Sequence, residues 1–562
     1  MKNNKRIYFI GCFLLVFAFI LMGRLVWLQI FHHDEMVAYA DKQQVKTVEI
    51  SVSHRGDVLD RNGAIITNNT EKPALLVFPS LVNDVNKTAA IIGEIANLDI
   101  ETISNKIAGN SKKNKDIRYL PFYAKSNLTP TEVADFKEAN LNGVFVVGEV
   151  SRYQNDTPMM HLLGSLAVVT REDVLKNTVK SDYKEGDFKG ASGLERIYEK
   201  QLKGTKGRGF AVVVDEKNKI IKPDNYYIFN GDNKKNKSTV KLTVDLGIQR
   251  CLENAFGEKS GAGVILDSKT GDVLAMASAP KYDPLFINAP KSDDAYVNKA
   301  LKSYAPASLF KIFDTAIALE KGIIQKETPV YCNGVYTLDN GREIHCWKEH
   351  GHGAMTFNSA LAKSCNPVYV DLGLKLGANN LEKAFKKWEL DKDILLGYDL
   401  KMQSSLNLGS KTTGEIANAV LGENGVLLTP LNLAKLINVI ACGGYLTVPR
   451  LVTEVNSGAN EMKKTFPHSF AVRVISAKTA DTVKNMMAET FQLGTGASLG
   501  LNNLDIAGKT GTSETGSVWI GGFFPTANPK YTIVILVEDG KSGVGDGGPI
   551  LKKVCGYLQG LQ

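Results

Sequence analysis

One apolar run constrains this chain more than any other feature. Residues from Ile7 to Met22 are apolar or aromatic except for Gly11, and the sequence becomes apolar again after Gly23 and Arg24. A helix needs about 20 apolar residues to cross the hydrocarbon core of a bilayer, so the run predicts a membrane span. Because the chain has no second run of this kind, a polytopic membrane protein is excluded.

The residues that flank the run predict an uncleaved anchor and its orientation. Lys2, Lys5 and Arg6 precede it, which favours a cytoplasmic N-terminus and an extracytoplasmic body. Arg24 can extend toward the outer interface, where Trp27 would anchor the helix. A signal peptide would end in a small-x-small cleavage site, which the segment Gly-Arg-Leu-Val-Trp lacks. We therefore expect a single-pass protein of the cell membrane.

The rest of the chain is long enough for large folded parts. Its 562 residues correspond to three or four domains of about 150 residues, or to fewer larger ones. Hydrophobic residues make up 44% and charged residues 22%, which excludes a largely disordered chain. The net charge of +8 is small for this length, and we expect no nucleic-acid partner. We predict a tip and anchor at 1–31, a pedestal at 32–240 and a catalytic domain at 241–562.

The pattern of residues differs between the pedestal and the catalytic domain. The pedestal alternates helical patterns at 89–98 and 130–138 with strand-like runs at 143–150 and 210–214. Its lysine-rich stretches at 111–115 and 232–237 read as solvated loops, the second as a linker. The sequence of the catalytic domain predicts longer elements than those of the pedestal. They are a helix at 243–256, a β-hairpin from 262, helices from 308, 359 and 429, and strands at 517–524 and 530–538. Strands at both ends around a helical middle predict an α+β domain with its sheet between helices.

A serine and a lysine one helical turn apart can form a nucleophile and its base. Four Ser-x-x-Lys tetrads occur, beginning at Ser181, Ser238, Ser278 and Ser308. Only Ser308-Leu-Phe-Lys311 opens a helical pattern, so only there would both side chains lie on one helix face. Burial of that helix would lower the pKa of Lys311 and allow it to act as a base.

Two further motifs follow this tetrad along the chain. They are Ser364-Cys-Asn366 and Lys509-Thr-Gly-Thr512, and each also has a second copy, Ser405-Leu-Asn407 and Lys269-Thr-Gly271. Lys269-Thr-Gly271 lies in the turn of the predicted hairpin. Any single triplet is a weak signal, and the order of the three motifs along the catalytic domain is what indicates a common site.

This set of motifs resembles that of the penicillin-binding proteins. The segment Arg55-Gly-Asp-Val-Leu-Asp-Arg-Asn-Gly63 is similar to a signature near the start of the class B enzymes, as are Gly193-Leu-Glu195, Thr429-Pro-Leu431 and Trp519. The anchor and the lack of a glycosyltransferase module agree with class B rather than class A. The resemblance implies the penicillin-binding serine transpeptidase fold, α+β with a sheet between helices, on an extended mixed α/β pedestal.

The resemblance also implies an activity and a role for each motif. Such enzymes are peptidoglycan D,D-transpeptidases that cross-link stem peptides through an acyl-serine, and β-lactams inhibit them covalently. Ser308 would be the nucleophile, Lys311 its base, Ser364 a proton shuttle and Asn366 a holder of the substrate amide. Backbone N–H groups of Ser308 and Thr512 would form an oxyanion hole, and the substrate carboxylate would meet Lys509, Thr510, Gly511 and Thr512. The implied partner is a polytopic glycosyltransferase of the shape, elongation, division and sporulation (SEDS) group.

The sequence departs from the pattern of the family at three places. Pro306-Ala307 precedes the nucleophile where Pro-Gly is usual, and Gly422-Glu-Asn424 stands where Gly-Gln-Gly is usual. Arg152-Tyr153 is followed by Gln-Asn-Asp rather than Pro-x-Gly. The first two departures lie where they could alter the acylation rate, and none of the three removes a catalytic group.

Three of the seven cysteines gather near the Ser-x-Asn motif. Cys332, Cys346 and Cys365 lie close to His352 along the chain, and Cys365 lies inside the motif itself. Thiols outside the membrane normally oxidise, and one disulfide would leave one of the three over. Three cysteines with one histidine form a standard structural zinc set, so we expect Zn²⁺ here, with a disulfide or unpaired thiols as the alternatives. Similar clusters in some elongation-type relatives favour an elongation or sporulation subgroup.

Two other functions compete with the transpeptidase. A β-lactamase would need a deacylating group and a small soluble chain, which the anchor and pedestal argue against. A β-lactam sensor or a non-catalytic scaffold would carry an acylable serine that does not turn over, and the sequence leaves that alternative open.

Overall fold

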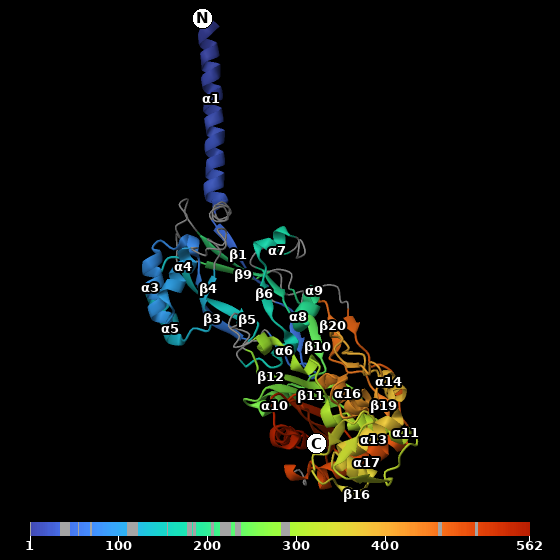
Figure 1. Cartoon of the computed structure of the whole chain (residues 1–562). Coiled ribbons are helices and arrows are strands. Elements are labelled where there is room, and N and C mark those ends of the chain that lie inside the picture. The colour runs from blue at the N-terminus through green and yellow to red at the C-terminus, as the bar shows by residue number, and fades with distance from the viewer. Residues whose placement is uncertain are drawn as a thin grey trace.

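A computed structural model gives the architecture of the chain. It describes residues 2–33, 45–53, 55–67, 70–108, 122–153, 156–176, 183, 187–203, 207–213, 226–230, 238–282, 293–458, 463–500 and 504–561. The predicted loops at 111–115 and 232–237 lie outside these residues. A long helix projects from one end, a mixed part follows, and the C-terminal module forms the far end (Figure 1).

The projecting helix carries the predicted membrane span. It consists of α1 (Lys2–Val26) and a π-helical turn, η1 (Trp27–Phe31). The segment Phe9–Phe31 is long and apolar enough to cross a bilayer, and none of its side chains is buried against the rest of the chain. The Arg24 guanidinium lies 4.2 Å from the centre of the Trp27 ring, at the end of the helix nearer the body. Among the described residues, this helix is the one that is long and apolar enough to form the predicted single-pass anchor.

The pedestal contains two three-stranded antiparallel sheets. One sheet has the order β1 (Val45–Ser53), β8 (Gly207–Val213) and β9 (Tyr226–Asn230). The other has the order β4 (Phe122–Lys125), β3 (Thr70–Val77) and β5 (Val144–Ser151). Apolar residues of the second sheet pack against α3 (Val85–Ala96), α4 (Ile100–Ala108) and α5 (Pro130–Ala139). Smaller elements complete it: η2 (Pro79–Leu81), α6 (Met160–Leu163), β6 (Leu166–Val168), α7 (Arg171–Leu175), β7 (Phe188–Gly190), α8 (Gly193–Ile197) and α9 (Glu199–Leu202).

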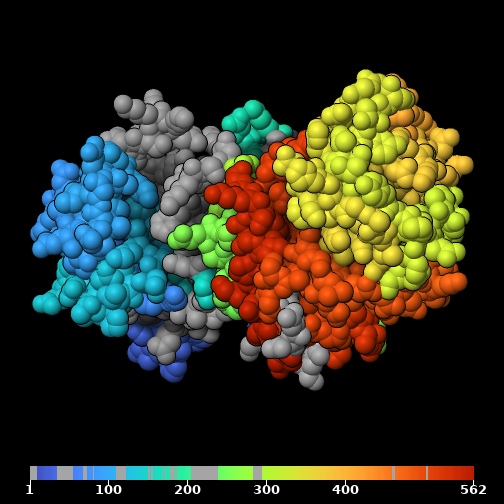
Figure 2. All heavy atoms as spheres, turned by 60° about the horizontal axis from the view of Figure 1, so that its bottom comes forward, coloured from blue at the N-terminus to red at the C-terminus, as the bar shows by residue number. Residues whose placement is uncertain are grey.

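A four-stranded sheet joins the pedestal to the C-terminal module. Its order is β2 (Asp57–Leu59), β10 (Thr239–Leu242), β20 (Val452–Asn456) and β21 (Lys463–Thr465), with β2 and β10 parallel. The boundary that we drew between residues 240 and 241 therefore falls inside β10. Figure 2 shows the blue and cyan residues of the pedestal at one end of the body and the yellow and orange residues of the C-terminal module at the other, with the red C-terminal residues between them.

The C-terminal module is built on a five-stranded antiparallel sheet. Its order is β12 (Val273–Ala279), β11 (Gly261–Asp267), β25 (Tyr531–Val537), β24 (Val518–Phe524) and β23 (Ala507–Thr512). Strands from both ends of the module thus lie side by side, and the predicted hairpin is β11 with β12. One face packs against α10 (Leu246–Phe256) and α18 (Gly548–Gln559). The other packs against the helical middle, so the expected sheet between helices is confirmed.

The helical middle holds most of the large core. Its helices are α11 (Lys311–Glu320), α12 (Phe357–Ala362), α13 (Asn366–Leu376), α14 (Ala378–Lys387), α15 (Thr413–Val420), α16 (Pro430–Ala441) and α17 (Ala477–Leu493). Short strand pairs are β13 (Pro329–Cys332) with β16 (Gly353–Thr356), β14 (Val335–Thr337) with β15 (Glu343–His345), β17 (Ser405–Leu406) with β18 (Val426–Leu427), and β19 (Tyr445–Leu446) with β22 (Val472–Arg473). Helical turns are η4 (Asp293–Tyr296), η5 (Lys299–Leu301), η6 (Ala307–Leu309), η7 (Ala497–Leu499) and η8 (Gly543–Gly547).

Candidate active site

The predicted nucleophile lies in a tight turn rather than in a regular helix. Ser308 is in the 3₁₀ turn η6, and the α-helix α11 begins only at Lys311. The α-helix therefore begins three residues later than expected, and Ser308 follows Ala307, whose φ of 50° is outside the right-handed helical region. The Trp519 indole N–H donates to Ala305 O at 2.9 Å and fixes the approach to the turn. Leu309 and Phe310 are fully buried, which anchors the turn in the core.

Lys311 is buried and bonded to the Ser-x-Asn motif. Its Nζ donates to Asn366 Oδ1 at 2.7 Å, to Ser364 O at 3.1 Å and to Ser364 Oγ at 3.4 Å. Asn366 is the first residue of α13, and Ser364 has a φ of 52° in the turn before it. Burial lowers the pKa of Lys311 to about 8, since charge is costly in an apolar core. An amine with that pKa can accept a proton near neutral pH.

The Lys-Thr-Gly motif lies on β23, next to the turn that holds Ser308. A Cβ placed on Gly511 would come within 3.1 Å of Ser308 N, so the strand and the turn are in direct contact. Lys509 is fully buried and donates to Thr510 O at 2.7 Å. Burial, together with repulsion from Lys311, holds the pKa of Lys509 well below its usual range. Thr510 donates from Oγ1 to Thr495 Oγ1 at 3.0 Å, and Thr512 is exposed at the strand end.

The structure thus brings together the three motifs and leaves their second copies elsewhere. Ser308, Lys311, Ser364, Asn366 and the strand with Lys509, Thr510, Gly511 and Thr512 form one site. Ser405 lies in β17, and Lys269 lies in the turn between β11 and β12. Among the other tetrads, Ser278 lies in β12 and Ser238 directly before β10, whereas Ser181 is outside the described residues.

Two titratable residues near Lys311 were not predicted as site residues. Asp314 is fully buried one helical turn after Lys311, and both of its carboxyl oxygens lack a hydrogen-bond partner among the described residues. Burial raises the pKa of Asp314 well above its usual range. Glu423 follows Gly422 near the Ser308 turn, and the departure at Gly422-Glu-Asn424 was the signal that could have drawn attention to it.

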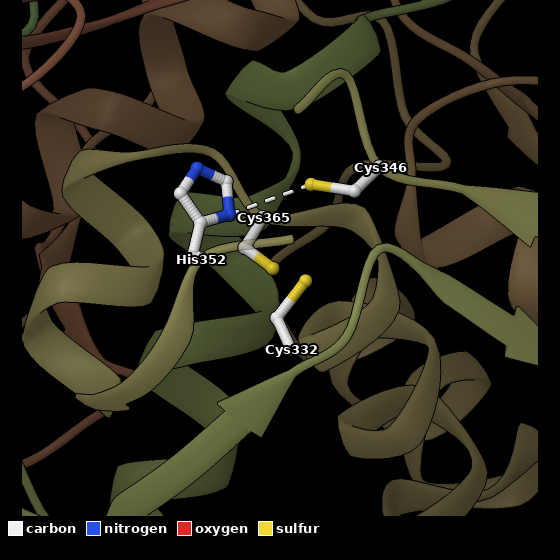
Figure 3. Close-up of side chains that lie close together, drawn as sticks. All are labelled: Cys332, Cys346, His352 and Cys365. Carbon is white, nitrogen blue, oxygen red and sulfur yellow. Dashed lines mark hydrogen bonds between the residues drawn. The ribbon is translucent and has the colours of Figure 1, made fainter. Parts of the chain in front are cut away.

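The three cysteines and the histidine meet beside this site. One ligand atom from each of Cys332, Cys346, His352 and Cys365 lies within 4.8 Å of the others. The side chains converge from β13, the loop after β15 and the turn before α13, as Figure 3 shows. Cys346 Sγ lies 3.4 Å from His352 Nδ1. His352 Nε2 is buried and has no hydrogen-bond partner in the described part of the chain. This donor set fits the tetrahedral sulfur and nitrogen ligands that zinc prefers.

Comparisons with known proteins agree with this geometry. Residues 261–556 match the family of the penicillin binding protein transpeptidase domain, and residues 50–233 match the penicillin-binding protein dimerisation domain. Stage V sporulation protein D of Bacillus subtilis is 26% identical over 582 residues, covering 99% of this chain and 85% of the relative. Peptidoglycan D,D-transpeptidase MrdA of Escherichia coli is 24% identical over 602 residues, covering 98% and 93%. Peptidoglycan D,D-transpeptidase FtsI of Escherichia coli is 26% identical over 583 residues, covering 98% and 90%.

Solved structures share the fold along nearly the whole chain. The crystal structure of the D,D-transpeptidase domain of a peptidoglycan glycosyltransferase from Eggerthella lenta has a TM-score of 0.59 and 24% identity, covering 91% of this chain and 100% of that chain. A chain of a structure described as structural coordination of polymerization and crosslinking by a peptidoglycan synthase complex has a TM-score of 0.66 and 23% identity, covering 99% of both chains.

Proposed function

The chain belongs to the class B penicillin-binding proteins, and on that premise we propose that it is a peptidoglycan D,D-transpeptidase whose nucleophile is Ser308. The observation that carries the assignment of Ser308 is the meeting of three distant motifs. Lys311 Nζ is bonded to Asn366 and Ser364, and the strand with Gly511 lies against the turn with Ser308. Among the described residues, the other copies of these motifs have no such neighbours.

The first half of the reaction acylates Ser308. Neutral Lys311 accepts the hydroxyl proton as Ser308 Oγ attacks the carbonyl carbon between the two D-alanines of a donor stem peptide. The developing oxyanion lies between the backbone N–H groups of Ser308 and Thr512, which lie on the adjoining turn and strand end. The C–N bond then breaks, and the proton passes from Lys311 through Ser364 to the leaving D-alanine. A β-lactam carbonyl would acylate Ser308 in the same way.

The other motif residues hold the donor peptide. Asn366 is anchored to Lys311 and keeps its amide nitrogen available for the substrate. Lys509, Thr510, Gly511 and Thr512 receive the terminal carboxylate along β23. An amine of a second stem peptide then attacks the acyl carbon, and the cross-link forms as Ser308 is released.

Labelling with a fluorescent penicillin tests this assignment. We expect Ser308→Ala to lose labelling completely, because no other group can form the acyl bond. Ser238→Ala is the matched control, since Ser238 belongs to another Ser-x-x-Lys tetrad and should label like the wild type. Retained labelling of Ser308→Ala would overturn the assignment of the nucleophile.

A cross-linking assay with lipid-linked substrate separates the transpeptidase from its alternatives. Cross-linked product from the wild type supports a transpeptidase. Labelling without product would indicate a sensor or a scaffold, and rapid release of hydrolysed penicillin would indicate a β-lactamase.

We also propose that Cys332, Cys346, His352 and Cys365 hold a structural zinc ion, which would place the protein in a zinc-containing elongation or sporulation subgroup. A bound zinc ion would tie the loop between β13 and β16 to the turn that carries Ser364. Support comes from the close approach of the four ligand atoms and from His352 Nδ1, which lies 3.4 Å from Cys346 Sγ. Burial raises the pKa of the Cys346 and Cys365 thiols, a cost that a cation would offset.

Removal of the metal tests the zinc proposal. We expect chelation to lower the melting temperature and to slow acylation, because Cys365 lies between Ser364 and Asn366. Cys346→Ser should reproduce both effects, whereas Cys251→Ser, a thiol on α10 outside the cluster, should not. Less than about a tenth of an equivalent of zinc, in protein purified without chelator, would overturn the proposal.

Finally, we propose an extracytoplasmic catalytic module and a membrane partner. The basic residues Lys2, Lys5 and Arg6 support a cytoplasmic N-terminus. The likeness over 99% of the chain to a protein from a peptidoglycan synthase complex supports a SEDS-type glycosyltransferase as the partner of α1 and the pedestal. Protease accessibility in intact spheroplasts tests the orientation, and copurification with a coexpressed SEDS protein, lost when residues 2–31 are replaced by an unrelated span, tests the partner.

A further inference from the structure

A carboxyl group that the mechanism above does not use lies beside the catalytic turn. Glu423 is half-buried in the loop that leads from α15 to β18. The preceding residue, Gly422, touches the turn directly: Ala307 N–H donates to Gly422 O at 2.8 Å. A Cβ on Gly422 would come within 2.0 Å of Ala307 O, so the two backbones are in the closest contact that glycine allows. This contact fixes Glu423 next to Ser308.

The carboxylate of Glu423 reaches across to the opposite wall of the site. Its Oε2 accepts a hydrogen bond of 3.4 Å from the backbone N–H of Glu514. Glu514 follows Thr512 by two residues, in the turn between β23 and β24. The carboxylate therefore links the loop that contacts the Ser308 turn to the turn that follows the strand with Thr512. In the proposed mechanism, the acyl carbonyl lies between the backbones of Ser308 and Thr512.

Two charged groups act on Glu423. Burial raises its pKa to about 7, repulsion from Glu514 adds to this, and attraction by Lys311 opposes it. The interaction with Lys311 is mutual, since Glu423 in turn raises the pKa of that lysine. The Glu423 carboxyl group thus responds to the charge of the catalytic lysine, and near neutral pH it can both accept and release a proton.

We propose that Glu423 is the base that deprotonates the acceptor amine, an inference that rests on the proposed transpeptidase function. An acceptor stem peptide arrives as a primary ammonium, which has no lone pair for attack. The ionised carboxylate attracts this cation to the acyl-enzyme and accepts one proton from it, giving a free amine and a carboxylic acid.

The remaining steps form the cross-link, release Ser308 and return the enzyme to its starting protonation state. The amine nitrogen forms a bond to the acyl carbon, and the ester bond to Ser308 Oγ breaks. The nitrogen loses a second proton, which passes through Ser364 and Lys311 to Ser308 Oγ. The proton on Glu423 then leaves to water, which restores the resting enzyme.

The partition of the acyl-enzyme between amine and water tests this role. The full-length protein in detergent is first acylated with a thioester analogue of the donor peptide. D-Alanine is supplied as the acceptor. The measured quantity is the ratio of transfer product to hydrolysis product. This ratio does not depend on how fast the acyl-enzyme forms. We expect Glu423→Gln to lower it about tenfold or more, since a positioned general base contributes about 10²- to 10⁴-fold.

A second acceptor separates this role from a structural one. Hydroxylamine is largely uncharged at neutral pH and needs no base, so Glu423→Gln should lower transfer to D-alanine far more than transfer to hydroxylamine. An equal loss with both acceptors, or an unchanged ratio with D-alanine, would overturn the inference.

The neighbouring carboxylate provides a variant that keeps Glu423 in place. In the wild type, the transfer ratio should rise with pH through about 7, the pKa of Glu423. Glu514→Gln removes the repulsion that raises this pKa, so the midpoint should move to lower pH. An unmoved midpoint would contradict the role of Glu423. Failure of the proposed function would look different, because the wild type would then give no cross-linked product from lipid-linked substrate.

Discussion

At the scale of single residues, burial decides which groups can do chemistry. Lys311 and Lys509 are both fully buried within one site, and burial lowers the pKa of each. The hydrogen-bond partners of the two lysines indicate different roles. Lys311 is held by Ser364 and Asn366, whereas Lys509 donates to Thr510 O on its own strand. The first lysine is therefore placed to exchange a proton with Ser308, and the second lies on the strand that would receive the substrate carboxylate.

The lowered pKa of Lys311 predicts how acylation depends on pH. A lysine accepts the Ser308 proton only when it is neutral, and with a pKa of about 8 its neutral fraction rises as pH rises. We expect the second-order rate of acylation by a fluorescent penicillin to increase about tenfold between pH 7 and 9. A rate that is constant or falls over this range, in protein shown to stay folded by circular dichroism, would exclude Lys311 as the base.

Only some of these site residues could be predicted from the sequence. Ser308 and Lys311 are three positions apart, so helical geometry alone predicted that they lie together. Asp314 belongs to no motif, and Glu423 is marked only by the departure at Gly422-Glu-Asn424. Neither spacing nor composition shows how far these carboxyl groups are buried or which charges lie near them. Their importance depends on what surrounds them, which the order of residues does not reveal.

At the scale of elements, the catalytic turn depends on the loop after α15. Ala307 has a φ of 50°, and its N–H is held by Gly422 O. Gly422 itself has a φ of 74°, a conformation that side chains other than glycine rarely adopt. The position of Ser308 is therefore set jointly by η6 and by a loop more than a hundred residues later in the chain.

Two glycines, one inside α15 and one just after it, test this dependence. Gly422→Ala would place a Cβ 2.0 Å from Ala307 O, and we expect it to displace the turn, to slow acylation at least about tenfold and to destabilise the protein by about 1–3 kcal/mol. Gly414→Ala is the control, because its Cβ would meet nothing within 4 Å and alanine favours the helix. Thermal melts and penicillin labelling of both variants test this expectation. Equal melting temperatures and equal labelling rates for Gly422→Ala and Gly414→Ala would contradict it.

Most predicted elements of the C-terminal module were confirmed because their signals are local. Thr429 caps α16 by accepting from Asn432 N, and the Lys-Thr-Gly-Asp turn connects β11 to β12. The pairing of strands, in contrast, could not be predicted from local signals. That β11 lies beside β25, and β2 beside β10, follows from long-range contacts between residues with no common pattern.

At the scale of the whole molecule, one buried ionic network lies at the junction between the pedestal and the C-terminal module. Glu195 is fully buried and accepts from Arg55 Nε at 2.8 Å, from Arg152 Nε at 2.7 Å and from Tyr153 Oη at 2.9 Å. Arg152 also donates to Gly56 O at 2.7 Å, directly before β2. Because β2 pairs with β10 in the sheet that joins the two parts, the network supports the junction itself.

Loss of this carboxylate should weaken the junction. We expect Glu195→Gln to destabilise the protein by about 3 kcal/mol, since it removes the counter-charge of Arg152 and leaves Arg55 with Glu199 alone. The measurement is the midpoint of chemical denaturation together with the rate of proteolysis between the pedestal and the C-terminal module. Glu172→Gln removes an exposed pair with Lys176 and should change the stability by less than about 0.5 kcal/mol. A similarly small effect of Glu195→Gln would show that the network is dispensable.

The sequence by itself determined the anchor, the α+β architecture and the three motifs, because apolar length, periodicity and short spacings are properties of neighbouring residues. Only the tertiary structure decided which copies of each motif share a site, since Ser308, Ser364 and Lys509 come from separate elements that meet through packing. It alone also placed Glu423 in the loop that contacts the turn with Ser308 and, among the described residues, left the Asp314 carboxyl group without a hydrogen-bond partner. Burial and the pKa shifts that follow from it depend on atoms supplied by the whole fold, so they exist only once the chain has folded.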